Sequence, residues 1–203
     1  MNSKYAIRLI QQSDTQEVLT IYQYYVQNTI ISFEYEAPTM EEYLERIKVN
    51  TEKYPWLVCL KNNKIIGFAY GSTHRYRTAY QWSPESTIYL VSNFHTKGIG
   101  RILYQTLFDL LKLQGYYNVF AGVALPNDKS IGFHKAMKFE EIGLFKNVGY
   151  KHGNWRHTHW FQLQLNDYNL APKNPNMLIE MIHQEEFKNT LIRANELLEK
   201  IAF

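Results

Sequence analysis

Hydrophobic residues in the first fifty positions recur at helical spacing in two places. The first set comprises Val18, Ile21, Tyr22 and Tyr25. It predicts a helix over about 14–27 that Ser13 or Asp14 caps. The second set follows Thr39 and Glu42, whose order matches a capping box, and comprises Tyr43, Leu44 and Ile47. A second helix therefore begins after Thr39.

Short runs rich in β-branched and aromatic residues predict the strands. These runs lie at 5–9, 56–60, 65–70, 85–94, 119–123, 139–144 and 160–165. Asn62 and Asn63 form a turn-prone pair that would join two of the strands into an antiparallel hairpin. Residues 5–9 are expected at an edge of the sheet.

Helical spacing returns in the second half of the chain. Helices are predicted from Ile102 to about Leu111, over 127–137 and over 178–201, so the order of elements is mixed α/β. The stretch after Asp167, YNLAPKNPN, is rich in turn formers. We therefore expect a domain over 1–166 and a C-terminal extension over 167–203, made of a linker and a helix. The apolar face of this helix packs either on the parent domain or on a second subunit.

Composition argues against several classes of protein. The 22 Lys and Arg residues nearly balance the 19 Asp and Glu residues and are scattered, so no nucleic acid partner is expected. The single cysteine, Cys59, lies in an apolar run and is expected in the core, without a disulfide or a thiolate metal cluster. No apolar stretch approaches the roughly 20 residues that span a bilayer, and the start of the chain lacks a signal-peptide pattern. We expect a cytoplasmic protein with no membrane partner.

The stretch NFHTKGIGR, residues 93–101, places two glycines and two cations where a strand turns into a helix. A phosphate loop of an NTPase would need four residues between its glycines and then Lys-Ser or Lys-Thr, which Gly98 and Gly100 do not provide. A dinucleotide fingerprint is a weak match, because Leu103 stands where a third small residue belongs. The remaining interpretation is a turn whose successive backbone N–H groups, at the N-terminus of a helix, can bind a pyrophosphate.

Three blocks of sequence, in order within residues 5–165, carry a resemblance to a known family. They are RYRTAYQWSPESTIYLVSNFHTKGIG, LPNDKSIGFHKAMKF and GYKHGNW. Together they resemble the phosphinothricin-type branch of the GNAT N-acetyltransferases. The resemblance implies the α/β (α+β) acyl-CoA N-acyltransferase fold: a mixed, mostly antiparallel sheet with a splayed central strand pair, flanked by helices. It also implies acetyl-CoA as cosubstrate, a small-molecule amine as acceptor and a homodimer.

The same resemblance distributes roles among residues of the blocks. Those expected at acetyl-CoA are Tyr89, Leu90, Val91, Thr96, Lys97, Gly98, Ile99, Gly100, Arg101, Asn127 and Ser130. Glu85 is the expected base, because an α-amine with a pKa of about 7.7–8.0 or higher is mostly protonated at neutral pH. Strand alternation places Glu85, Thr87 and Tyr89 on one face. His134 stands where the superfamily often has a tyrosine, and would protonate the departing thiolate or orient a water.

The acceptor pocket is expected to be cationic and aromatic. Its predicted residues are Phe33, Arg75, Arg77, Tyr80, Lys151 and His152. A guanidinium grips a carboxylate or phosphinate at two points, which suits a small, anionic, amino-acid-like acceptor. The resemblance implies phosphinothricin or methionine sulfoximine or sulfone as that acceptor. A polyamine, an aminoglycoside or a protein N-terminus is the first alternative, and a non-catalytic acyl-CoA-binding module is the second.

Three residues depart from the family pattern. His95 stands where Gln or Arg is usual, Lys138 where a glycine precedes Phe139, and His157 where an acidic residue is common. His157 and His159 are two apart on a predicted strand and could hold a zinc ion. Because no third ligand is identifiable in the sequence, no metal is predicted.

Overall fold

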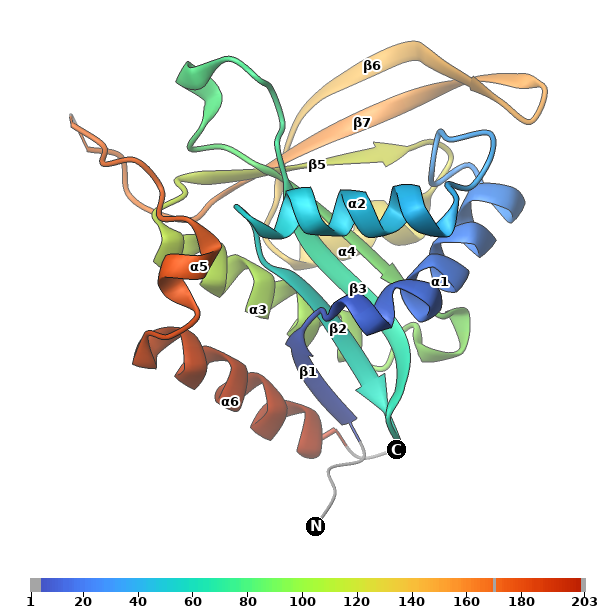
Figure 1. Cartoon of the computed structure of the whole chain (residues 1–203). Coiled ribbons are helices and arrows are strands. Elements are labelled where there is room, and N and C mark those ends of the chain that lie inside the picture. The colour runs from blue at the N-terminus through green and yellow to red at the C-terminus, as the bar shows by residue number, and fades with distance from the viewer. Residues whose placement is uncertain (1–4, 170, 202–203) are drawn as a thin grey trace.

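A computed structural model of the chain describes residues 5–169 and 171–201, which fold around a seven-stranded sheet (Figure 1). The strands are β1 (Tyr5–Leu9), β2 (Trp56–Lys61), β3 (Lys64–Ser72), β4 (Glu85–Leu90), β5 (Asn118–Ala124), β6 (Glu140–Lys151) and β7 (Asn154–Gln164). They lie in the order β1-β2-β3-β4-β5-β7-β6. All neighbours are antiparallel except β4 and β5, which confirms the predicted mixed, mostly antiparallel sheet.

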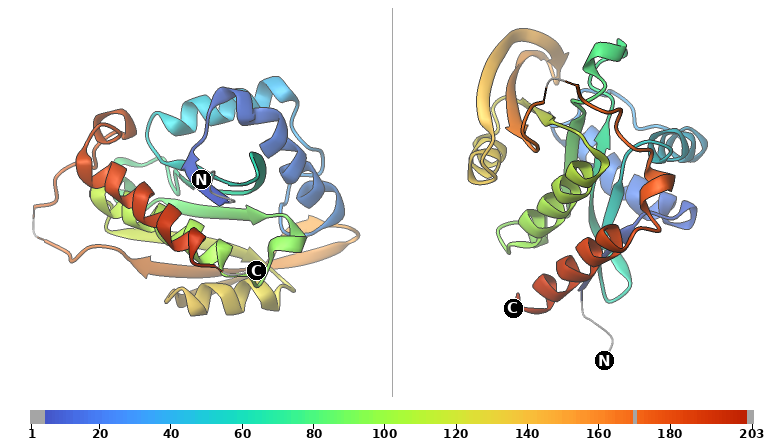
Figure 2. Two further views of the ribbon diagram at one scale, coloured as in Figure 1. Left: turned by 90° about the horizontal axis from the view of Figure 1, so that it is seen from below. Right: turned by 90° about the vertical axis from the view of Figure 1, so that its left-hand side faces the viewer.

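Helices cover both faces of this sheet (Figure 2). They are α1 (Thr15–Asn28), α2 (Met40–Thr51), α3 (Ile99–Gln114), α4 (Asp128–Ala136), α5 (Leu178–Met181) and α6 (Glu185–Glu199). Helices α1 and α2 pack on one face, whereas α3 and α6 pack on the other. The capping box at Thr39 and Glu42 is confirmed, because each side chain accepts a hydrogen bond from the other residue's backbone N–H. None of the described helices is long and apolar enough to cross a membrane.

The predicted bounds were wrong at the last hairpin. Strands β6 and β7 are much longer than the predicted 139–144 and 160–165. They meet at His152 and Gly153, whose φ angles of 50° and 74° give the left-handed pair that a two-residue hairpin turn requires. The exposed and irregular β6 does not alternate cleanly between apolar and polar residues, so its length could not be predicted from periodicity. The residues of the turn are the part of the sequence that could have located this hairpin.

Other helix ends also differ from the prediction. Helix α3 begins at Ile99, three residues before the predicted start, because Gly98 is its N-cap residue. The single helix predicted over 178–201 is two helices, α5 and α6. Asp14 does not cap α1 with its side chain: its carboxylate accepts hydrogen bonds from the Arg8 guanidinium at 2.6 and 2.8 Å.

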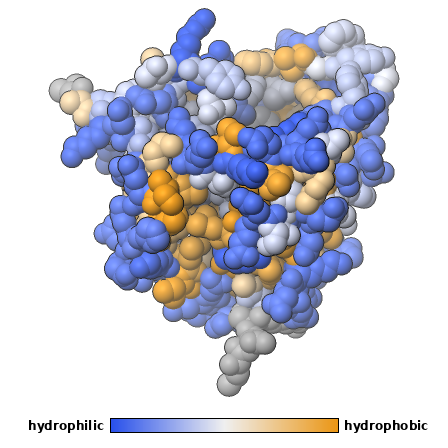
Figure 3. Space-filling view, viewed as in Figure 1, coloured by the Kyte–Doolittle hydropathy of each residue, from blue (hydrophilic) through white to orange (hydrophobic). Residues whose placement is uncertain are grey.

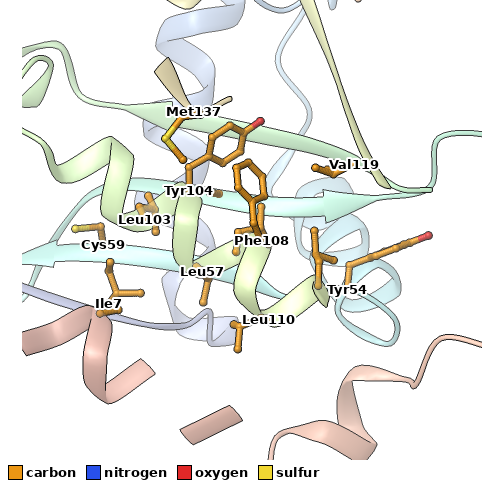
Figure 4. Packing of buried hydrophobic residues seen from close by; sticks show 14 of the residues in the cluster. Ile7, Tyr54, Leu57, Cys59, Leu103, Tyr104, Phe108, Leu110, Val119 and Met137 are labelled. Carbon is orange, nitrogen blue, oxygen red and sulfur yellow. The ribbon is translucent and has the colours of Figure 1, made fainter. Parts of the chain in front are cut away.

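Helix α3 lies at the centre of the larger core: Tyr104 and Phe108 point toward Met137 and Val119, while Ile7, Leu57 and Cys59 of β1 and β2 lie on its other side (Figure 4). Its Leu103 and Phe108 are buried in the same cluster as Leu57 and Cys59. Cys59 is fully buried, as predicted, and burial raises the pKa of its thiol to about 12. The thiol is thus a core group rather than a nucleophile.

The last helix packs on the parent domain, one of the two arrangements that the sequence left open. Phe187, Ala194 and Leu198 join the core around α3, and hydrophobic residues gather over α5 and α6 in the view of Figure 3. Asn195 contacts the open edge of β1: its Oδ1 accepts from the Ile7 N–H at 2.7 Å, and its Nδ2 donates to the Ile7 carbonyl at 3.0 Å. The boundary predicted after residue 166 stays a prediction. Residues 1–4 of the predicted domain, and residues 170 and 202–203 of the predicted extension, lie outside the described chain.

Candidate functional site

Strands β4 and β5 lie side by side only where they begin. Their paired position is Glu85 with Phe120, whose N–H donates to the Pro84 carbonyl at 2.9 Å. No further β4–β5 pair follows among the described residues, so the strands diverge toward their C-terminal ends. The splayed central pair is therefore confirmed, and Glu85 lies where the gap opens.

Backbone groups of β4 face this gap. The Val91 N–H donates to the Ile66 carbonyl of β3 at 2.8 Å, and the backbone of Tyr89 faces the same way. Alternation therefore turns the N–H groups of Leu90 and Ile88 toward the gap. The backbone groups of Tyr89 and Val91 are thus turned toward β3, and Ile88, which the sequence did not single out, has its N–H group turned toward the gap.

The Leu90 carbonyl fixes the loop that follows β4. It accepts hydrogen bonds from the Tyr25 hydroxyl at 2.5 Å and from His95 Nε2 at 2.8 Å. The departure at His95 thus has a structural role, because its side chain joins the glycine loop to β4.

The glycine loop presents backbone rather than side chains at the start of α3. Gly98 has a φ of 79°, which most residues avoid, and Thr96 is also left-handed at 61°. The Ile99 side chain is fully buried, so only its backbone is available to a ligand. A Cβ at Gly100 would lie 3.8 Å from its nearest neighbours, including Phe133, which is ordinary contact. Because the fold tolerates a side chain at Gly100, a ligand is the better reason for glycine there.

Two cations flank this helix N-terminus. Arg101 and Lys97 are exposed, and Lys97 Nζ lies 5.6 Å from the centre of the Phe94 ring. Together with the N-terminal end of a 16-residue helix, they make the loop electropositive. Oxygens of a phosphate or pyrophosphate suit such a site.

The Glu85 carboxylate is bound to a residue that sequence reasoning missed. Its Oε1 lies 2.6 Å from Nδ1 of His74, and the two side chains are 32% and 14% exposed. The His74 ring stacks on Phe120, with centroids 4.8 Å apart, and meets Trp160 edge to face. No periodicity or spacing in the sequence connects His74 to Glu85, because the contact depends on the fold of the loop between β3 and β4.

A buried polar network lies behind β4. The Ser86 hydroxyl is 2.6 Å from that of Tyr104, which is 3.5 Å from His134 Nε2. His134 Nδ1 lies 2.8 Å from the Ser130 carbonyl and must be the donor. Burial lowers the pKa of His134, although the bond to the Ser130 carbonyl opposes this, so the site favours the neutral ring. Both ring nitrogens of His134 face protein groups. The ring is therefore better placed to hold α4 in position than to donate a proton to a ligand.

Asn127 and Ser130 lie together at the start of α4. Asn127 Oδ1 accepts from the Ser130 N–H at 3.2 Å and so caps the helix. At the other end, Lys138 adopts a left-handed φ of 70°. The turn that a glycine would favour is therefore kept, with strain on the lysine.

The structure corrects the assignment of Lys151 to the acceptor pocket. This residue is 1% exposed, and its ammonium donates to the carbonyls of Val26, Ser32 and Glu34 at 2.7, 2.6 and 2.8 Å. An ammonium has three N–H groups, so none is left for an acceptor. The prediction was wrong because it rested on the block GYKHGNW alone, whereas the carbonyl partners of Lys151 lie far away in sequence.

The neighbouring residues join the same two segments. His152 Nε2 is 3.2 Å from the Thr29 carbonyl, and a Cβ on Gly149 would lie 2.4 Å from the Phe33 ring. The β6–β7 hairpin therefore packs closely on the α1–α2 loop. Phe33 and His152 are brought together at this junction.

The remaining acceptor residues lie on the exposed loop between β3 and β4. The Arg75 guanidinium lies 5.5 Å from the centre of the Tyr80 ring, and its Nε donates to His74 Nε2 at 3.4 Å. Arg77 is exposed at the start of a short 3₁₀ turn, Thr78–Tyr80. Arg75 thus belongs to the His74–Glu85 cluster, whereas Arg77 faces solvent.

A groove of about 840 Å³ runs along the α2 side of the sheet. Tyr70 and Ser72 line it, and Ser72 pairs with Glu85 across the β3–β4 ladder. Directly opposite residues of an antiparallel pair share a face, so the groove borders the face that carries Glu85. Its size is that of a small-molecule site.

The two histidines that suggested zinc have different partners. His157 Nδ1 accepts from the Asn147 N–H at 2.8 Å, beside an irregularity in β6, and His159 Nε2 is 3.6 Å from Glu141 Oε2. Within residues 5–169 and 171–201, no group of three or more His, Cys, Asp or Glu side chains could hold a metal ion.

Comparison with known proteins gives one family. A family model described as an acetyltransferase (GNAT) domain matches residues 7–160. The chain is 32% identical over 170 residues to a phosphinothricin N-acetyltransferase of Streptomyces viridochromogenes, covering 83% of this chain and 91% of the relative. It is 30% identical over 115 residues to an L-methionine sulfoximine/L-methionine sulfone acetyltransferase of Salmonella typhimurium, covering 57% and 67%.

Solved structures agree with this result. The chain is similar to a GNAT superfamily phosphinothricin acetyltransferase from Sinorhizobium meliloti in complex with acetyl-CoA, with a TM-score of 0.80 and 32% identity. The match covers 84% of this chain and 94% of that one.

Proposed function

The chain belongs to the GNAT acetyltransferase family and is an N-acetyltransferase, and we propose that it acetylates a small, anionic, amino-acid-like amine with acetyl-CoA. The observation that carries this proposal is the position of Glu85, at the point where β4 leaves β5. A carboxylate there borders the splayed gap and is in contact with His74 of the β3–β4 loop, the loop that also carries Arg77 and Tyr80. The names of the relatives support phosphinothricin or methionine sulfoximine or sulfone as the acceptor.

The residues at the gap fit acetyl-CoA. The backbone N–H groups of residues 98–100, with the side chains of Lys97 and Arg101, would hold the pyrophosphate. The N–H groups of Leu90 and Ile88 would bond the pantetheine arm. When bound, acetyl-CoA supplies a thioester carbonyl for attack by the amine.

Glu85 acts on the acceptor. At neutral pH an amino-acid amine is mostly an ammonium ion, which cannot attack a carbonyl. The Glu85 carboxylate takes a proton from it, directly or through a water, and so supplies the neutral nucleophile. General base catalysis of this kind contributes about 10²–10⁴-fold to the rate.

The exposed arginine of the β3–β4 loop selects the acceptor. Arg77 would bind a carboxylate or phosphinate through two N–H groups, with the Tyr80 ring beside it. An anionic acceptor agrees with such a cation, whereas a polyamine or an aminoglycoside would be repelled by it.

An amine panel tests the function. Release of the coenzyme A thiol is measured with phosphinothricin, methionine sulfoximine and methionine sulfone, and in parallel with spermidine, kanamycin and a peptide N-terminus. We expect turnover in the first group at least tenfold above the second, since one charge-assisted contact is worth about 1.5–3 kcal/mol. Faster turnover of a cationic amine would show that the acceptor is not an anionic amino-acid analogue. Acetyl-CoA binding by calorimetry without turnover of any amine would indicate a binding module instead.

We also propose that the chain forms a homodimer through the β6–β7 hairpin. Strand β6 is at an edge of the sheet and, with the start of β7, exposes Ile142, Phe145, Val148 and Trp155. Exposed apolar groups on an edge strand support pairing with another chain. Light scattering of the eluting protein tests this, and a monomer at micromolar concentration would contradict it.

A further inference from the structure

The hydrogen bond between His74 and Glu85 occupies one oxygen of the proposed base. At 2.6 Å the contact from Nδ1 to Oε1 is short, as is typical when a carboxylate accepts from a strong donor. The ring cannot swing away freely, because it stacks on Phe120 and meets Trp160 edge to face at 5.4 Å. The carboxylate is therefore held in one orientation.

A second contact fixes the tautomer of His74. The Arg75 Nε–H group lies 3.4 Å from His74 Nε2, and a guanidinium can only donate. Nε2 must therefore carry a lone pair, which leaves the ring proton on Nδ1, facing Glu85. Arg75 is itself placed over the Tyr80 ring. The chain of contacts runs from the acceptor loop to the base.

We propose that His74 is a positioning residue for catalysis: its Nδ1–H holds Glu85 Oε1, so that Oε2 is the oxygen that receives the amine proton. The inference rests on the proposed function, in which Glu85 is the base. In the step, one N–H bond of the acceptor ammonium breaks, the proton bonds to Oε2, and the electron pair stays on the amine nitrogen. His74 keeps its Nδ1 proton throughout the step.

Two substitutions separate the hydrogen bond from the packing of the ring. His74→Phe keeps a ring on Phe120 but removes the donor, and we expect kcat to fall by about 10–100-fold, the cost of a misplaced catalytic group. His74→Asn puts an amide donor near the place of Nδ1 and should recover most of this loss. The KM for acetyl-CoA should stay unchanged in both. His183→Phe, the same change at an exposed position after α5, is the matched control and should leave kcat unchanged.

Kinetics with phosphinothricin or methionine sulfone also distinguish the two levels of the proposal. If Glu85→Gln leaves kcat unchanged, the proposed base is wrong. If Glu85→Gln lowers kcat but His74→Phe does not, only the positioning role is wrong. We expect His74→Phe to add little in a Glu85→Gln background, because the two side chains act as one unit. Equal losses from His74→Phe in both backgrounds would overturn the inference.

A measurement on the resting protein needs no turnover. In ¹⁵N NMR spectra of histidine-labelled protein at pH 8, the ring signals missing from the folded His74→Asn variant belong to His74. We expect them to show a proton on Nδ1. A His74 ring with no proton on Nδ1 would overturn the inference, whatever the enzyme acetylates.

Discussion

The glycine loop and the acceptor side of Glu85 present their chemistry in opposite ways. The loop offers backbone N–H groups, which the φ of Gly98 and the start of α3 hold in place. The acceptor side depends on contacts between side chains, such as the hydrogen bond between His74 and Glu85. A site made of backbone is insensitive to most side chains around it, whereas a site made of side chains fails when one partner is exchanged.

The largest effect is expected at the loop. Valine cannot adopt the left-handed φ of Gly98 without strain, so Gly98→Val should turn N–H groups away from the pyrophosphate. Each hydrogen bond to a charged group is worth about 1.5–3 kcal/mol, so losing two weakens acetyl-CoA binding by roughly 100-fold or more. Calorimetric titration with acetyl-CoA measures this. Gly143→Val is the control, because nothing lies within 4 Å of a Cβ there. Unchanged affinity in Gly98→Val would remove the loop from the cofactor site.

The next largest effect should fall on stability, at the junction of hairpin and loop. Lys151→Met leaves three carbonyls without their donor, and a buried unsatisfied group costs about 1–3 kcal/mol. We expect a loss of about 2–4 kcal/mol in the free energy of unfolding, measured with urea. The exposed Lys146→Met on the same hairpin should change it by less than about 0.5 kcal/mol. A stable Lys151→Met enzyme with a raised amine KM would return this lysine to the acceptor pocket.

The two arginines of the acceptor loop should respond differently. Arg77→Ala should raise the amine KM by about 10–100-fold and leave the acetyl-CoA KM unchanged, since a charge-assisted contact is worth about 1.5–3 kcal/mol. Arg77→Lys should restore the KM only in part, because lysine lacks the planar fork. Arg75→Ala, which loosens His74, should instead lower kcat. Steady-state kinetics with both substrates varied separate these outcomes, and a collapse of acetyl-CoA binding in Arg77→Ala would place Arg77 at the cofactor.

A smaller effect depends on pH. An unfolded histidine binds a proton below about pH 6.5, whereas burial lowers the pKa of folded His134. Between these two pKa values the unfolded chain binds more protons, so stability falls as the pH falls below about 6.5. Urea unfolding at pH 7.5 and 5.5 should show a larger drop for the wild type than for His134→Gln. Equal drops would mean that folded His134 titrates like an exposed ring.

The smallest effect is expected at the turn after α4. Lys138→Gly relieves a left-handed lysine, and should stabilise the protein by about 0.5–1 kcal/mol after the added chain entropy of glycine is counted. Ala136→Gly, at the last residue of α4, should instead lower the stability, because that residue is already helical and glycine only adds chain entropy. Urea unfolding of both variants checks the sign. A destabilised Lys138→Gly variant would show that the lysine side chain contributes more than the strain costs.

The same contrast explains what could be predicted from the sequence. Periodicity, capping residues and glycines report on backbone, so most strands and helices, the splayed pair and the glycine loop were predictable. Contacts that a side chain makes with another element leave no periodic signal, which is why His74 was missed and Lys151 was misplaced. The direction of Ile88 and Leu90 toward the gap also required the strand pairing, because the sequence alone does not say which neighbour a strand bonds.

The amide of Asn195 has a consequence beyond holding α6 in place. It offers β1 one acceptor and one donor, the same pair that a further strand would offer to Ile7. An unpaired edge is a template on which other chains add, and proteins avoid aggregation by covering or interrupting it. In this chain a single side chain imitates a neighbouring strand at the middle of a five-residue edge. Through this contact, α6 covers the β1 edge against pairing with other chains, although the helix lies far from the glycine loop and Glu85.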